Sequence, residues 1–179
     1  MNDHQEKYLD TDWVFSMIIA MIEESIYHTE TFAYSLEVHH NDKAAKVFYL
    51  ICEQFKAELH IVLNNLPDAD LPHIPPWEVP YAEYQHPSSV LMNANYLMSE
   101  SEAWKLMDQK IDIHNDFYIF LLKKNVEGII FNVSDHLIKY CNQFREENKR
   151  QEAKAETKHT KSLEDLDIIS LHSSEGGLW

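Results

Sequence analysis

The chain has 179 residues, and its 15 Lys and Arg against 30 Asp and Glu give a formal net charge of −15 with His neutral. This length suits one core with tails. The negative charge opposes binding to nucleic acid and to anionic membrane surfaces. The longest apolar run, residues 13–22, is shorter than the roughly 20 residues of a membrane helix, and the polar start lacks a basic signal region. We expect a cytoplasmic protein without nucleic-acid or membrane partners.

The pattern of apolar residues predicts an all-α fold. Only three glycines occur, and alternating segments typical of strands are missing. A first helix is expected from about Asp12, as its N-cap, to Val38, and a second from about Lys43 to Leu66. The two cysteines lie within apolar helical patterns, which predicts buried thiols rather than a disulfide or a zinc site.

A proline-rich segment separates these helices from two more. All six prolines lie within 67–87, which therefore cannot form one helix. Its length predicts a crossover along a four-helix bundle. A third helix is expected from Ser88 or Ser89 to Lys124, and a fourth from about Asn125. The residues expected to face the interior from these two helices are Tyr96, Ala103, Met107, Lys110, His114, Phe117 and Leu121, then Val126, Ile129, Ile130, Val133, His136, Leu137, Tyr140 and Phe144.

The chain divides into a polar segment 1–12, a bundle 13–144 with hairpins 13–66 and 88–144, and a tail 145–179. Residues 145–161 are mixed in charge, which predicts a protruding solvated helix end. The rest of the tail is acidic with small apolar clusters, so we expect a mobile segment that contacts a protein partner or a second copy in a homo-oligomer. The expected docking residues are Leu166, Ile168, Ile169, Leu171, Leu178 and Trp179.

The two halves of the bundle also resemble each other. The apolar pattern from Phe48 to Glu58 matches the pattern from Val126 to His136 without a gap. Two helices, a long crossover and two more helices is the connectivity of ferritin-like bundles. With the segments VFYLICEQF and HNDFYIFL, residues 13–144 resemble the rubrerythrin-like branch of the ferritin-like superfamily.

This resemblance implies a two-iron site at the bundle centre, with a buried Glu on the first helix of each half and Glu-x-x-His on the second. The matching positions in this chain hold Ser25, Lys110, Phe55, Glu58, Val133 and His136. One carboxylate and one histidine of the expected set therefore remain, and Lys110 adds a positive charge. Because two divalent cations in a core need neutralising anions, we expect a degenerate site without dinuclear chemistry.

The polar residues expected at the bundle centre are Ser25, His28, Glu58, Lys110, His114 and His136. One hypothesis is a buried polar network or ligand site without a cofactor, in which Lys110 replaces the charge of the metals and pairs with Glu58. The alternative is one iron or another divalent metal held by Glu58, His114 and His136. No catalytic residue is assigned.

Two functions follow from these alternatives. The favoured one is a binding, assembly or regulatory scaffold without enzyme activity, and the other is an iron-dependent oxidoreductase or ferroxidase. In addition, Leu166–His172 is similar to the Leu-x-Ile-Gly-Ser-Leu type of peptide that loads cargo into encapsulin shells, with Ile169 in place of the glycine. Either function is compatible with cargo in such a shell.

Overall fold

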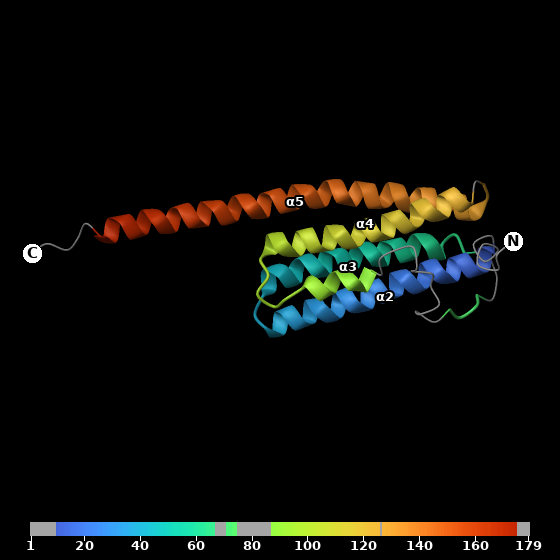
Figure 1. Cartoon of the computed structure of the whole chain (residues 1–179), viewed down its shortest axis with the longest axis horizontal. Helices are drawn as coiled ribbons and strands as arrows, with labels where there is room; N and C mark the ends of the chain where they lie inside the picture. The colour runs from blue at the N-terminus through green and yellow to red at the C-terminus, as the bar shows by residue number, and fades with distance from the viewer. Residues whose placement is uncertain (1–9, 67–70, 75–86, 126, 175–179) are drawn as a thin grey trace, which may run out of the picture.

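The computed structural model describes residues 10–66, 71–74, 87–125 and 127–174, and for residues 87, 88, 155, 156 and 158–174 it describes the backbone only. The elements in these ranges are α2 (Thr11–Val38), α3 (Asp42–Leu63), the 3-10 helix η4 (Pro87–Asn93), α4 (Glu100–Lys124) and α5 (Ile129–Ser174). The prediction of an all-α chain is confirmed: the described ranges contain four α-helices and no strand. Their arrangement fits a four-helix bundle (Figure 1).

The four helices form two hairpins that pack side by side (Figure 1). α2 packs against α3, and α4 packs against α5. The turn between α2 and α3 lies at the end of the bundle where α4 begins, because the side-chain amide of Asn41 donates to the backbone carbonyls of Tyr96 and Met98. The last turn of α3 lies at the opposite end (Figure 1). Most of the predicted 67–87 crossover falls outside the described residues.

Short polar side chains fix the start of three helices. The carboxylate of Asp10 accepts hydrogen bonds from the first turn of α2, so Asp10 is the N-cap and the prediction of Asp12 was wrong. Asn41 caps α3. Ser99 and Glu102 form a capping box at the start of α4. The expected start at Ser88 or Ser89 was therefore wrong, because η4 and a turn separate those residues from α4.

The core contains most of the apolar residues that the helical patterns predicted, and both cysteines are buried with 1% exposure. The prediction for α5 was wrong at two positions, since Ile129 is 39% exposed and His136 is exposed. The interior face of α5 follows Ile130, Val133 and Leu137 at helical spacing. His136 therefore lies beside the interior face of α5 and not on it. Tyr96, expected within a helix, lies in the turn before α4 and is 45% exposed.

The last helix is longer than the sequence pattern indicated. The prediction of a charged helix extension after residue 144 is confirmed, but α5 continues through residues 162–174, where we expected a mobile tail. Leu178, Trp179, Val126 and most of the 1–12 segment lie outside the described residues. None of the described helices has the length and apolar character needed to cross a membrane.

Candidate functional site

A buried polar network occupies the centre of the bundle, and we define it as Ser25, Thr29, Glu58, Lys110, His114, Tyr118 and Cys141. All four helices contribute, because Ser25 and Thr29 lie on α2, Glu58 on α3, and Cys141 on α5, with the other three on α4. The spacing of four residues from Lys110 to His114 to Tyr118 places these side chains on one face of α4. Each of the seven residues is at most 2% exposed.

His114 connects α2 to α3 through its two ring nitrogens. Its Nδ1 lies 3.1 Å from Oε2 of Glu58, and its Nε2 lies 2.8 Å from Oγ of Ser25. A carboxylate only accepts, so Nδ1 donates to Glu58, and in the neutral ring Nε2 accepts from the Ser25 hydroxyl. The ring also stacks on Phe55, with a centroid distance of 4.5 Å. These contacts hold the His114 ring in one orientation, and the ring is not exposed to solvent.

Glu58 is the common acceptor of the network. Besides His114, the Tyr118 hydroxyl donates to its Oε2 at 2.7 Å and the Cys141 thiol donates to its Oε1 at 3.6 Å. Burial and the nearby carboxylate of Glu58 raise the pKa of Tyr118 and of Cys141. Both groups therefore stay protonated at neutral pH and act as donors. Cys141 has the environment of an inert thiol rather than of a reactive thiolate.

Lys110 is the cation of the network, and its contacts differ from our prediction. Its side chain is 0% exposed, and its Nζ donates to Oγ1 of Thr29 at 2.9 Å and to the carbonyl of Ser25 at 3.3 Å. The Nζ also lies 5.6 Å from the centroid of the Phe55 ring. The predicted pairing with Glu58 was wrong, because Lys110 takes oxygen partners on α2 and Glu58 takes partners on α4 and α5.

Burial lowers the pKa of Lys110 to about 8, an effect that the Glu24 carboxylate partly offsets. The cause is the loss of water around the ammonium group. The neutral oxygens of Thr29 and Ser25 solvate the charge, but they do not balance it as an adjacent carboxylate would. The amine therefore stays mainly protonated at pH 7, at a cost to stability.

The order Ser25, His114, Glu58 is also the order of a serine hydrolase triad, in which a histidine takes the proton of a serine nucleophile. That chemistry requires a substrate carbonyl beside the serine. Ser25 is 1% exposed and His114 is 0% exposed, and Ser25 is not among the residues that line the groove described below. The arrangement connects helices through hydrogen bonds, and it leaves no space for acyl transfer at Ser25.

Two of the six predicted central residues lie elsewhere. His28 is half-buried and forms an ion pair with Glu24 at 3.4 Å on the outer side of α2. His136 is exposed, so it does not join Glu58 and His114, and the predicted mononuclear metal set was wrong. Among the residues that the structure describes, no group of three or more His, Cys, Asp or Glu side chains is placed to hold a metal ion.

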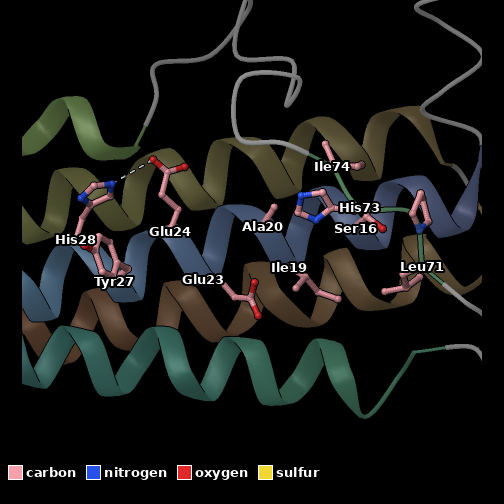
Figure 2. A pocket seen from close by; sticks show the side chains of 11 residues that line it. Ser16, Ile19, Ala20, Glu23, Glu24, Tyr27, His28, Leu71, His73 and Ile74 are labelled. Atoms are coloured by element: carbon pink, nitrogen blue, oxygen red, sulfur yellow. Dashed lines mark ion pairs between the residues drawn. The ribbon is translucent and has the colours of Figure 1, made fainter.

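A groove of about 580 Å³ follows the outer face of α2. Figure 2 shows the ion pair of Glu24 and His28 at one end of the groove and the 71–74 segment toward the other. Ser16, Glu23, Tyr27 and apolar residues line the rest. Glu23, Glu24 and His28 lie on α2 and His73 lies on the 71–74 segment, so the two acids and the two histidines do not converge on one ligand atom.

The network has three members that were not predicted from the sequence, namely Thr29, Tyr118 and Cys141. Two of them had a visible signal, because Thr29 follows Ser25 by four residues and Tyr118 follows His114 by four. A helix places such residues on one face, so a buried polar residue predicts a polar neighbour at that spacing. Cys141 had no comparable signal, because a cysteine in an apolar stripe is an ordinary core residue.

Comparisons with protein-family models, with curated proteins and with solved structures find no match to this chain.

Proposed function

We propose that this chain is a ferritin-like, rubrerythrin-related bundle that has lost dinuclear metal chemistry and acts as a binding and assembly scaffold. The observation that carries the proposal is the place of Lys110. Its ammonium group lies in the bundle interior with 0% exposure and is hydrogen bonded by Thr29 and Ser25. A divalent cation at the same place would meet this positive charge, and both would lie in a medium of low dielectric constant.

The carboxylate that remains supports the same proposal. Both oxygens of Glu58 already accept hydrogen bonds, from Tyr118 and His114 on one side and from Cys141 on the other. A metal ion would have to displace these donors and leave them buried without partners, which costs about 1–3 kcal/mol for each group. Hydrogen-bonded side chains therefore fill the bundle interior and leave no open coordination site. The binding of partners would then take place on the outer surfaces of the bundle.

Elemental analysis of the full chain, purified from iron-supplemented cells, tests the proposal. We expect well under one iron per chain and no ferroxidase or peroxide-dependent turnover. Two irons per chain, with turnover that Glu58→Ala abolishes, would overturn it.

A variant that removes the positive charge of Lys110 tests whether this charge is what excludes a metal ion. Lys110→Glu places a second carboxylate in the core near Glu58 and His114, so a divalent cation should raise its melting temperature. Lys139→Glu, at a lysine whose side chain is 68% exposed, serves as the matched control and should show no such rise. If Lys110→Glu is also indifferent to the cation, Lys110 is not what excludes the metal.

A further inference from the structure

α5 extends well beyond the rest of the bundle. Two ion pairs set its register against the antiparallel α4, Lys105 with Glu152 and Asp112 with Arg145. Continuing this register places Glu100, the first residue of α4, opposite about residue 157 of α5. Residues 158–174 then project by about 25 Å past the start of α4 at 1.5 Å per residue. Figure 1 shows this projection at the end of the bundle where α2 turns into α3.

The charges along this part of α5 are divided into two halves of equal length. Residues 149–161 carry five Lys or Arg and two Glu, for a net charge of +3. Residues 162–174 carry one Glu and two Asp without Lys or Arg, for a net charge of −3. The first half lies mostly beside α4, and the second half lies in the projecting part. A helix with this division repels a parallel copy of itself and attracts an antiparallel copy.

Apolar residues follow the same division. The acidic half contains Leu163, Leu166, Ile168, Ile169 and Leu171, whereas the basic half has no large apolar residue. In an antiparallel pair, the acidic half of one copy would therefore run past the bundle end of the other. That end exposes apolar residues in η4 and in the turn before α4, with Leu97 94% and Met92 87% exposed. These residues give this end of the bundle an exposed apolar surface, on the side of α4 and α2 that η4 contacts.

We propose that two copies of this chain form an antiparallel homodimer, in which residues 162–174 of each copy dock along residues 149–161 and the bundle end of the other. The two-fold axis crosses α5 near residues 161 and 162, so both charge contacts form at once and the assembly closes. This proposal rests on the proposed scaffold function, and it identifies the binding partner of the scaffold as a second copy of the chain.

Charge reversal tests the pairing in the full chain. The variant Glu164→Lys/Asp165→Lys/Asp167→Lys makes both halves basic, and Lys154→Glu/Lys158→Glu/Lys161→Glu makes both halves acidic. Either variant should raise the dissociation constant of the dimer by more than ~10-fold in sedimentation equilibrium, because like charges then face each other. An equimolar mixture of the two variants should form a heterodimer. Lys123→Glu/Lys124→Glu/Lys139→Glu reverses three exposed lysines elsewhere and should keep the homodimer.

Cysteine cross-linking tests the orientation, since both natural cysteines are buried. In the antiparallel pair, Ser162→Cys should form a disulfide with its copy under mild oxidation. Ser174→Cys should not, because the two copies of residue 174 lie at opposite ends of the contact. Efficient disulfide formation by Ser174→Cys would indicate a parallel pair and refute the arrangement.

A monomeric wild-type chain, or a dimer that resists both charge reversals, would also overturn the proposal. Circular dichroism of each variant establishes that the helices are intact. The iron content of the same samples is an independent result: iron would contradict the scaffold function whether or not the chain dimerises, and a monomer without iron would refute only the dimer.

Discussion

Replacing Lys110 by methionine tests whether the bundle interior carries an uncompensated positive charge. The pKa of Lys110 falls from the ordinary 10.5 to about 8 in the folded chain, and this difference corresponds to roughly 3 kcal/mol against the protonated folded state at low pH. Methionine has a similar length and removes the charge. It also removes the hydrogen bonds to Thr29 and Ser25, each of which contributes about 1 kcal/mol. Lys110→Met should therefore stabilise the chain by about 1–2 kcal/mol at pH 7.

The sign of the pH dependence follows from proton binding. Between pH 8 and 10.5 the unfolded chain holds a proton on Lys110 that the folded chain has lost. The contribution of Lys110 to stability therefore increases as the pH rises, by roughly 2 kcal/mol between pH 7 and 9.5. Lys110→Met lacks this contribution, so its advantage should disappear by pH 9.5. The raised pKa values of Tyr118 and Cys141 affect both chains equally.

Urea unfolding followed by circular dichroism at several pH values between 7 and 9.5 gives the two stability curves. Lys139→Met, at a lysine whose side chain is 68% exposed, should give a curve parallel to the wild type. The contrary result is that Lys110→Met lowers stability by more than about 2 kcal/mol at pH 7 and that its stability curve is parallel to that of the wild type. Lys110 would then be a compensated charge, and the inference of an uncompensated charge in the interior would be wrong.

Three further predictions concern the core, a cap and the tail. Glu58→Gln leaves Tyr118 and its neighbours with a weaker acceptor and should destabilise by about 2–3 kcal/mol in urea unfolding; no change would show that the hydrogen bonds to Glu58 contribute nothing. Ser99→Ala removes the capping box with Glu102 and should cost about 1 kcal/mol in urea unfolding; unchanged stability would show that the cap contributes nothing. Deleting 162–179 should leave the melting temperature nearly unchanged at low concentration, and a sharp fall would place the tail in the core.

Several parts of the site could be predicted from the sequence because they depend on periodicity. Ser25, Lys110 and His114 share helical spacing with apolar neighbours, and all three are buried. Glu53 and His60 lie on the opposite face of α3 from its apolar stripe, and both are exposed. The inward or outward direction of a side chain on a helix is a local property, so one sequence suffices to find it.

The sequence also contains a specific signal for the start of α4. Ser99 and Glu102 have the spacing of a capping box, and this is a more specific start signal than a serine after a proline. In contrast, the match between the two halves misplaced His136. The repeat aligned it with Glu58, but the residue of α5 that reaches Glu58 is Cys141. An alignment of apolar patterns does not fix how far one helix is shifted along another.

The sequence alone determined that the chain is helical and that its interior contains a lysine and a histidine. That residues 162–174 continue the last helix was seen only in the structure. Only the tertiary structure decided which buried groups meet. Lys110 and Glu58 carry opposite charges, which favoured their pairing, yet Lys110 contacts Thr29 while Glu58 contacts His114, Tyr118 and Cys141. The physical reason is that hydrogen bonds act over about 3 Å, whereas helix periodicity gives only the direction of a side chain, and the packing of four helices sets the distances between them.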